Sequence, residues 1–352
     1  MTMAPFYAAV GLMAIALFAA APTAVAQPQQ FDLGLPTDNR ALLTGRAEDF
    51  FQFVDREFEG EKTFPWEAGQ FGFVRNPRRL GNRIAFTRFH EGVDVKPLQR
   101  DARGDPLDEV RAILAGAVVY VTATASQSNY GRYVVVRHDW GEGPFFSLYA
   151  HLSEATVTVG QRLNAGEKLG RMGYTGRGIN QQRAHVHVEL NLSLSSRFDD
   201  WHATYFRSPN HHGVYNGLNL LGLDLQRLYL AHRENPSLSV AQFVRSSEAH
   251  FEITVPGDAP MEVAKRYQWL GDGSLLAVVP PSWQVRCTRW GLPVSVKPGA
   301  KVVTQPEVTW IKDDAIPHLY NTRGLITGSG ATAKLTDEGL RFVQLLCGWM
   351  IQ

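Results

Sequence analysis

Short runs of β-branched and alternating apolar residues, separated by glycines, constrain the fold of this chain more than any other feature. These runs are Val118 to Ala123, Tyr133 to Arg137, Phe145 to Ala150, Thr156 to Val159, and His185 to Leu192. Runs of this length, bounded by turn residues, are typical of short strands and not of helices. The sequence therefore predicts a mainly antiparallel β domain in this part of the chain.

The chain beyond this region has a different texture. A polar stretch rich in His and Asn runs from Ser208 to Asn216, and an apolar run with helical spacing follows from Leu218 to Ala231. We therefore place a linker at 193–216 and a separate C-terminal domain of unknown role at 217–352. Further elements expected in that domain are the strands Phe251 to Val255, Leu275 to Val279 and Val302 to Thr304, and a helix from Asp337 to Cys347 capped by Thr336. The expected fold class is α+β, with a mainly antiparallel β domain and a mixed α/β C-terminal region.

The first residues have the pattern of an export signal. Met1 to Ala26 contains an apolar run and ends in Ala24-Val25-Ala26, the small-x-small pattern typical of a signal-peptidase site. The start of the segment carries no Lys or Arg, so an uncleaved membrane anchor is the alternative. Both interpretations place the rest of the chain outside the cytoplasm. We expect a cleaved signal peptide at 1–26 and a periplasmic or secreted protein.

Two segments separate this signal from the β domain. Residues 27–40 are polar and contain Pro and Gly, which favours a flexible linker. Residues 41–87 are expected to flank the β domain, which we delimit as 88–192. From Ala41 to Phe64 the spacing of Leu and Phe residues suggests a short amphipathic helix.

The charge balance excludes some classes of partner. Lys and Arg total 35 and Asp and Glu total 34 in 352 residues, so the chain has no strong global field. We therefore expect no nucleic-acid partner and no membrane association beyond the signal segment. A charged substrate must be held by local groups.

The two cysteines are Cys287 and Cys347. An isolated pair in an oxidising compartment is more often a disulfide than a redox or metal site, so we expect them to be bonded to each other. Two separate buried thiols are the alternative, because both cysteines lie near aromatic or aliphatic residues.

Four short pieces carry the residue types of a catalytic metal site: Arg88-Phe-His90-Glu-Gly92-Val-Asp94, Tyr149-Ala-His151-Leu, Thr175-Gly176, and His185-Val-His187-Val-Glu189. Zinc in hydrolases takes three protein ligands, commonly imidazole or carboxylate, and keeps a fourth position for water. Two His and one Asp satisfy that count.

The spacing within these pieces is suited to one site. Side chains two apart project from the same face of a strand, so His185, His187 and Glu189 share a face. His90 and Asp94 are separated by an even number and can face one way on a strand or on a helical turn.

Gly92 and Pro97 argue against the helical turn. The remaining histidines, His138 and the adjacent pair His211 and His212, are assigned to the surface or to packing. Adjacent residues on a strand point to opposite faces and do not easily share a metal there.

The order H-x(3)-D, Y-A-H-L, T-G and H-x-H-x-E resembles the lysostaphin-like, or LytM-domain, zinc endopeptidases, which hydrolyse peptidoglycan. The resemblance covers about Arg88 to Asn191, under a third of the chain. It implies a β fold of the duplicated-hybrid-motif type. Outside the metal and catalytic positions the chain departs from the pattern, with a longer segment from Asp94 to Gly116 and with Asn180 to Ala184 in place of a second Thr-Gly.

By that resemblance one Zn²⁺ ion is held by His90, Asp94 and His187, and the catalytic histidines that do not bind the metal are His151 and His185. Bound zinc lowers the pKa of its water, one imidazole accepts a proton and the other stabilises the developing oxyanion. The sequence leaves open which histidine takes which part.

Two further residues near the site have alternative interpretations. Glu189 orients a ligand imidazole, or it is an ordinary salt-bridge residue of the strand. Arg88 resembles the Arg that precedes the first ligand in many family members and is suited to bind a substrate carboxylate, or it is a surface arginine.

The resemblance and the export signal together predict an exported zinc metalloendopeptidase, with the zinc endopeptidase domain at 88–192 and peptidoglycan stem peptides or cross-links as substrates. The alternatives are a noncatalytic wall-binding or regulatory protein of the same fold, and a zinc peptidase that acts on secreted proteins. The first alternative is disfavoured because degenerate members are expected to lack ligands, and this chain lacks none.

Overall fold

The computed structural model describes residues 31–53, 56–63, 68–122, 124–259, 261–271 and 279–348. The expected signal peptide 1–26 lies outside these ranges, as does the strand expected at Leu275 to Val279 except for its last residue. Among the described residues, no helix combines the length and the apolar composition needed to cross a bilayer.

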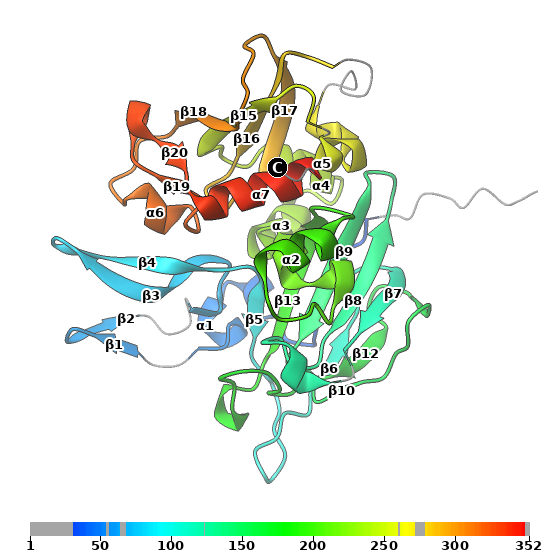
Figure 1. Cartoon of the computed structure of the whole chain (residues 1–352). Coiled ribbons are helices and arrows are strands. Elements are labelled where there is room, and N and C mark those ends of the chain that lie inside the picture. Colours follow the sequence, from blue (N-terminus) through cyan, green and yellow to red (C-terminus); the bar gives the residue numbers. More distant parts are fainter. Residues whose placement is uncertain are drawn as a thin grey trace, which may run out of the picture.

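The largest sheet is antiparallel throughout and has the order β11-β7-β8-β9-β13-β14, with β5 also paired to β13. Its strands are β5 (Val93–Val95), β7 (Gly116–Val121), β8 (Val134–Asp139), β9 (Pro144–Ala150), β11 (Arg162–Leu163), β13 (Val186–Ser193) and β14 (Leu220–Gly222). A smaller antiparallel sheet, β10-β12-β6, consists of β6 (Glu109–Arg111), β10 (Glu154–Ala155) and β12 (Lys168–Arg171). Both sheets belong to the lower lobe of the molecule (Figure 1).

The β-branched runs become the central strands as predicted. Strands β7, β8, β9 and β13 overlap the runs expected from sequence, and every residue of β13 is buried. The strand expected at Thr156 to Val159 is wrong, because the strand occupies Glu154–Ala155 and the chain then turns. Gly160 adopts φ 92° in that turn, and Val159 is exposed.

The N-terminal residues form two hairpins and short helical turns in place of the predicted amphipathic helix. The elements are η1 (Ala41–Thr44), α1 (Ala47–Phe50), β1 (Arg56–Phe58), β2 (Glu61–Thr63), β3 (Gly72–Leu80) and β4 (Arg83–His90). The helix expected from Ala41 to Phe64 is therefore wrong. Phe50 and Phe51 are fully buried where the helical turn gives way to extended backbone, so their side chains serve core packing and not a helical face. The β3–β4 hairpin extends to one side of the two lobes (Figure 1).

Residues 31–40, expected as part of a linker, are packed against the fold. The backbone N–H of Gly34 donates to the carbonyl of Ile113 at 2.8 Å, and Phe31 lies 5.2 Å from Trp140 between ring centroids. The stretch expected as the linker 193–216 contains the helix α2 (Phe198–Tyr205) and the short turn η5 (Gly213–Tyr215).

The upper lobe holds a four-stranded antiparallel sheet, β17-β16-β15-β18, with helices beside it (Figure 1). Its strands are β15 (Phe251–Pro256), β16 (Ser282–Cys287), β17 (Pro293–Gly299) and β18 (Glu307–Ile311), and β19 (Ile326–Thr327) pairs with β20 (Lys334–Leu335). The helices are α3 (Leu225–Glu234), α4 (Val240–Arg245), α5 (Glu262–Arg266), α6 (His318–Asn321) and α7 (Asp337–Cys347), with the short turns η7 (Gln268–Leu270) and η8 (Gly330–Thr332). The turn η6 (Gly217–Asn219) directly precedes β14 of the main sheet.

The outcome of the C-terminal predictions is mixed. The last helix is confirmed, since the Thr336 side chain accepts from the backbone N–H of Gly339 and caps α7. The strand at Phe251 to Val255 is confirmed as β15. The helical run expected from Leu218 to Ala231 is only half right, because its first part becomes β14 and extends the main sheet beside β13. The strand expected at Val302 to Thr304 is wrong, because β18 begins at Glu307.

One continuous cluster of buried apolar residues joins the two lobes. It includes Val188 and Leu190 of β13 together with Val285 of β16 and Leu346 of α7. The Tyr267 hydroxyl adds a polar contact between the lobes, because it donates to the Pro144 carbonyl at 2.7 Å and accepts from the Ser193 N–H at 2.8 Å. The fold class is α+β with mainly antiparallel sheets, as predicted.

The predicted disulfide is absent. Cys287 and Cys347 are both free and buried, which matches the alternative of two separate buried thiols. The Cys347 thiol lies 3.7 Å from the Met261 sulfur, and burial raises the pKa of this thiol to about 12. Each cysteine is packed as a small apolar group in the shared core.

Candidate metal centre and catalytic cleft

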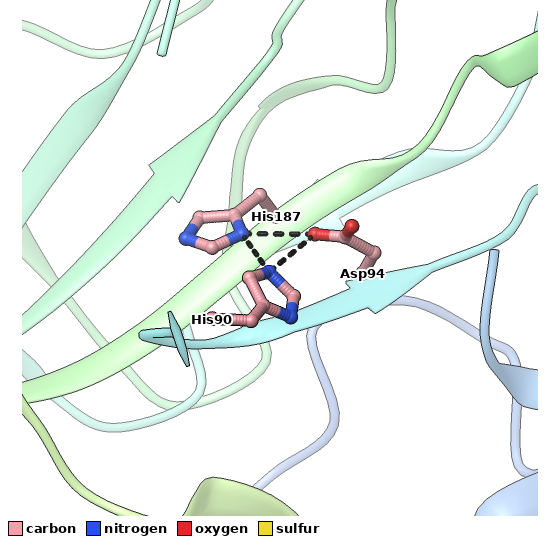
Figure 2. A group of neighbouring side chains, drawn as sticks. All are labelled: His90, Asp94 and His187. Carbon is pink, nitrogen blue, oxygen red and sulfur yellow. Dashed lines mark hydrogen bonds and ion pairs between the residues drawn. The ribbon is translucent and has the colours of Figure 1, made fainter. Parts of the chain in front are cut away.

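Three side chains from three strands meet at one point (Figure 2). His90 ends β4, Asp94 lies in β5, and His187 lies in β13 directly opposite Asp94 in the antiparallel pairing. Gly92 allows this approach, because a Cβ at that position would lie 2.4 Å from the Val188 carbonyl oxygen. The H-x(3)-D spacing therefore works through two strand segments joined by a glycine, and the predicted strand conformation is confirmed for Asp94.

The three predicted metal ligands converge through one atom each. His187 Nδ1 lies 2.9 Å from Asp94 Oδ1, and His90 Nε2 lies 3.0 Å from His187 Nδ1 and 3.1 Å from Asp94 Oδ1. All three residues are buried.

The far nitrogen of each ligand imidazole is already engaged. His90 Nδ1 donates to the Gln70 carbonyl at 2.7 Å, and His187 Nε2 donates to Glu189 Oε1 at 2.7 Å. Tyr130 donates its hydroxyl to the same Glu189 oxygen at 2.7 Å. When the rings are neutral, these partners fix the tautomers, so that His90 Nε2 and His187 Nδ1 present lone pairs to the centre.

A small cation fits this arrangement. Three ligand atoms about 3 Å apart need a positive charge between them, which is either a proton on His187 Nδ1, as the raised pKa of this residue indicates, or a metal ion. Ligand atoms about 2.0–2.1 Å from a tetrahedral zinc lie about 3.3 Å apart, close to the distances observed. Two imidazoles and one carboxylate are a donor set that zinc accepts.

The electrostatics of the centre favour a cation. Burial alone raises the pKa of Asp94, but electrostatic interactions with the nearby His90, His185 and Arg75 hold that pKa well below its usual range. Burial alone lowers the pKa of His187, but hydrogen bonds to Asp94 and Glu189 raise it to about 9. A site that attracts a proton this strongly onto His187 Nδ1 also attracts a metal, which competes with that proton.

Sequence reasoning missed Arg75. Its terminal nitrogen lies 2.5 Å from Asp94 Oδ2, and its Nε donates to the Ala68 carbonyl at 3.0 Å. Arg75 lies on β3, opposite Arg88 of β4, next to a register shift in the hairpin. No spacing in the sequence connects it to Asp94, because the contact depends on the hairpin folding over the ligand.

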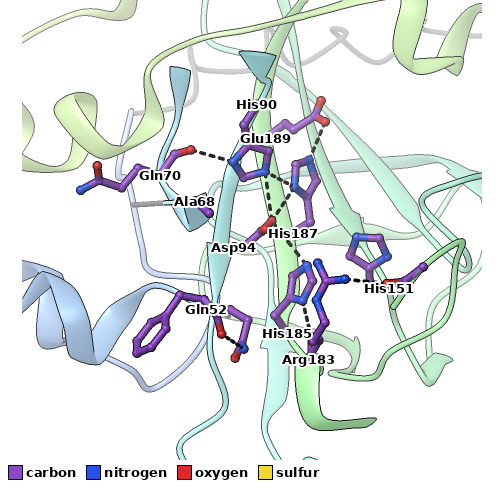
Figure 3. Close-up of polar contacts among 12 residues, drawn as sticks. Gln52, Ala68, Gln70, His90, Asp94, His151, Arg183, His185, His187 and Glu189 are labelled. Carbon is purple, nitrogen blue, oxygen red and sulfur yellow. Dashed lines mark hydrogen bonds and ion pairs between the residues drawn. The ribbon is translucent and has the colours of Figure 1, made fainter. Parts of the chain in front are cut away.

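The two predicted catalytic histidines lie beside the centre (Figure 3). His185 Nδ1 donates to the Arg183 carbonyl at 2.6 Å, and His185 Nε2 lies 3.5 Å from Asp94 Oδ1. His151 Nδ1 donates to the Thr175 carbonyl at 2.8 Å, and the rings of His151 and His185 lie 4.7 Å apart between centroids. Because each Nδ1 carries a proton, each Nε2 is an acceptor in the neutral ring.

Burial and neighbouring charge keep both rings neutral. Burial and the nearby His185 and His187 hold the pKa of His151 well below its usual range, and burial also lowers the pKa of His185. His151 has φ 62°, in the left-handed region that costs free energy for a residue with a Cβ. This strained backbone aims the Tyr-Ala-His-Leu histidine at the cleft.

The remaining motif, Thr175-Gly176, supports His151. Besides the carbonyl contact, the Thr175 hydroxyl donates to the Leu152 carbonyl at 2.9 Å. Gly176 has φ 108°, and a Cβ there would lie 2.4 Å from the Asn129 carbonyl oxygen. The loop therefore needs glycine at this position.

The segment that departs from the family pattern also contributes. Asn180 caps η4 (Gln181–Arg183) by accepting from the Arg183 N–H at 3.1 Å. The capped turn fixes the Arg183 carbonyl, which holds His185 in place. This segment thus supports His185, which is predicted to be catalytic, without the second Thr-Gly.

The centre lies in a cleft of about 1310 Å³, and Arg88 lies on its wall as an exposed side chain. His212 also reaches the cleft but is held by packing, since Tyr120 bonds to its Nδ1 at 2.8 Å and its Nε2 donates to the Gln127 carbonyl at 3.0 Å. His138 is buried away from the cleft. Both agree with their assignment to packing.

The part of the chain that contains the metal centre is similar to known peptidases. Residues 88–197 match the profile of Peptidase family M23. The chain is 32% identical over 116 residues to the peptidoglycan DD-endopeptidase ShyC of Vibrio cholerae, a match that covers 33% of this chain and 23% of that protein. It is also 32% identical over 118 residues to an uncharacterized metalloprotease of Haemophilus influenzae, covering 34% of this chain and 22% of that protein. The matches thus span less than a quarter of these relatives.

Among solved structures, the catalytic domain of lysostaphin from Staphylococcus simulans is 26% identical, with a TM-score of 0.25 and coverage of 34% of this chain and 75% of that one. The catalytic domain of the M23 protein EnpA from Enterococcus faecalis is 22% identical, with a TM-score of 0.25 and coverage of 39% and 79%.

Proposed function

We propose that this chain is an exported zinc metalloendopeptidase that cleaves peptidoglycan stem peptides or cross-links, a proposal supported by the match of residues 88–197 to Peptidase family M23. One observation carries the proposal. His90, Asp94 and His187 direct one ligand atom each to one buried point, and the imidazoles of His151 and His185, each held through Nδ1, lie beside it. The export assignment rests on the sequence pattern of residues 1–26.

A zinc ion held by His90, Asp94 and His187 would lower the pKa of its bound water and polarise a peptide carbonyl. The neutral imidazoles of His151 and His185 are acceptors through Nε2, so either can take a proton from the attacking water. Once protonated, the same Nε2 becomes a donor for the oxyanion or for the leaving amine. Glu189 and Tyr130 keep the His187 ring in the ligand orientation.

The wall substrate is supported by the relative named a peptidoglycan DD-endopeptidase, which shares only a part of its length with this chain. The alternatives, a noncatalytic wall protein and a peptidase of secreted proteins, differ from the proposal in measurable ways. Cleavage of purified sacculi, compared with cleavage of a denatured protein substrate, distinguishes a peptidoglycan peptidase from a peptidase of secreted proteins.

The decisive experiment compares the mature protein with His187→Ala and with His211→Ala, the latter an exposed histidine. Zinc content and release of new peptide ends from purified peptidoglycan are measured together. We expect one zinc per chain and cleavage in the wild type and in His211→Ala, and loss of both in His187→Ala. Bound zinc without cleavage of sacculi or protein would replace the proposal with the noncatalytic alternative.

A further inference from the structure

The cleft around the centre carries an excess of positive charge. Five arginines line it, Arg75, Arg88, Arg177, Arg183 and Arg323, against two carboxylates, Glu91 and Asp94. Bound zinc would add two further positive charges. The charge balance of the whole chain, near zero, is therefore not the balance of the cleft.

Both carboxylates of the cleft are already paired. Asp94 lies against Arg75, and Glu91 Oε1 lies 3.6 Å from a terminal nitrogen of Arg323. Arg323 comes from the upper lobe, where it has φ 58° and places its guanidinium 5.3 Å from the centroid of the Phe89 ring. The upper lobe thus supplies the cation that neutralises Glu91 at the edge of the cleft.

Three arginines remain without a carboxylate partner in the part of the chain that the structure describes. Arg88 is exposed on β4, two residues before His90. Arg177 is exposed on the loop between β12 and β13. Arg183 lies on the same loop and donates to the Gly178 carbonyl at 2.7 Å. The three cations therefore approach the centre from the hairpin side and from the loop side.

We propose that the cleft selects peptides with free carboxylates beside the scissile bond, bound by Arg88, Arg177 and Arg183. This inference rests on the proposed function and specifies its substrate class. An arginine fork binds a carboxylate through two parallel hydrogen bonds, and such charge-assisted bonds are stronger than neutral ones. A peptide with free carboxylates beside the scissile bond would pair with these forks, whereas a neutral peptide would leave them unpaired.

The ion pair of Glu91 and Arg323 should also affect the binding of an anionic peptide. Removal of the Arg323 charge leaves Glu91 unpaired, so that a carboxylate of the protein faces the incoming carboxylates. Arg323→Gln is therefore expected to weaken binding of an anionic peptide. The double variant Glu91→Gln/Arg323→Gln has the original net charge of the pair and is expected to recover most of the binding.

The test measures binding to the full-length mature chain after zinc removal with a chelator, so that it does not depend on cleavage. The probes are a fluorescein-labelled cross-linked stem-peptide dimer with free carboxylates and the same dimer with those carboxylates amidated. We expect the free-carboxylate probe to bind at least tenfold more tightly, with the difference shrinking as NaCl is raised. Arg88→Gln and Arg177→Gln should each lose about tenfold in affinity for that probe alone, because each variant loses a charge-assisted hydrogen bond to a carboxylate. Arg245→Gln, an exposed arginine of α4 outside the cleft, should bind as the wild type does.

Equal binding of the two probes, or no binding of the free-carboxylate probe, would overturn the inference. Cleavage of the two probes by the zinc-loaded protein is measured separately. If neither probe nor sacculi are cleaved while the free-carboxylate probe still binds selectively, the proposed function fails and the carboxylate site stands. If both probes are cleaved with equal kcat/KM and bound equally, the function stands and the carboxylate site fails.

Discussion

Arg75 holds the outer oxygen of Asp94, 2.5 Å from Oδ2, while the inner oxygen Oδ1 faces His90 and His187. The two oxygens of this carboxylate are thereby divided between a permanent partner and the metal position. Arg75 is also anchored to the backbone at Ala68, so its guanidinium has little freedom. A residue outside the segment that matches family M23 thus leaves one oxygen of Asp94 available as the proposed metal ligand.

Replacement of Arg75 by Met should weaken zinc binding by about 10–100-fold, the range found when partners that orient metal ligands are removed. The loss of orientation should outweigh the relief of repulsion between Arg75 and the metal. Competition with a chromophoric chelator measures the affinity without reference to activity. Arg83→Met, which removes an exposed arginine of the same hairpin, is the matched control. Tighter zinc binding in Arg75→Met would show that charge repulsion dominates.

Replacement of His151 or His185 by Ala should lower kcat by about 10²–10⁴-fold, the usual contribution of a general acid or base. Both variants should retain one zinc per chain, because neither imidazole contributes an atom to the convergent triad. Zinc content and kcat are measured on the same preparations. Loss of zinc from His185→Ala would mean that this residue belongs to the metal site.

Gly92→Ala should destabilise the fold and weaken zinc binding together. The added Cβ would lie 2.4 Å from the Val188 carbonyl oxygen and 3.0 Å from His187 Cε1, so β5 and the His187 ring must shift. Overpacking of this kind costs about 1–3 kcal/mol. Urea denaturation and chelator competition measure the two effects. Gly34→Ala is the control, because its Cβ would meet only the Ile113 carbonyl oxygen at 3.6 Å, and wild-type stability in both variants would contradict the argument.

A buried hydrogen-bond chain ends at His138 and makes stability depend on pH. The Ile113 N–H donates to the Tyr149 hydroxyl, which contacts Ser147, and the Ser147 hydroxyl lies 2.7 Å from His138 Nε2. His138 Nδ1 donates to the Ala115 carbonyl at 2.8 Å, so the neutral ring completes the chain. Burial lowers the pKa of His138 to about 4.

Because the folded pKa of His138 lies below the unfolded value of about 6.5, the unfolded state binds more protons between these values. Stability should therefore fall as the pH drops from about 6.5 toward about 4, with His138 accounting for about 2 kcal/mol between pH 7 and pH 5. Urea denaturation at the two pH values measures the loss. His138→Gln should be less stable than the wild type at pH 7. Between pH 7 and pH 5, however, its free energy of unfolding should fall by about 2 kcal/mol less than that of the wild type. An equal loss in both proteins would remove His138 as the cause.

The relative positions of side chains within one strand could be predicted, because they follow directly from the spacing in the sequence. Alternation along one strand places His187 and Glu189 on one face, and their side chains are in contact. Arg75 and Arg323 were not readable, because a bulged hairpin and a packed lobe carry them to the cleft.

The errors in the fold have the same origin. Phe50 and Phe51 have the apolar character of a helix face, but tertiary packing buries both in the core at the end of a single helical turn. Leu220 and Leu221 were expected in a helix and pair instead with β13, because the edge of the sheet offers unpaired backbone groups. Intrinsic secondary-structure propensity therefore decides the conformation of such a segment only where strand pairing or core packing does not favour another conformation.

The core that runs from β13 to α7 restricts the positions at which recombination could join part of this chain to another protein. A crossover between residues 216 and 217 would separate β14 from the sheet that it extends and would strip Tyr267 from its contacts with Pro144 and Ser193. A peptidase portion joined to a foreign partner at that point would expose apolar surface that its own second half now covers. The parts of the chain before and after residue 217 are therefore expected to be inherited together and not to be exchanged as separate modules.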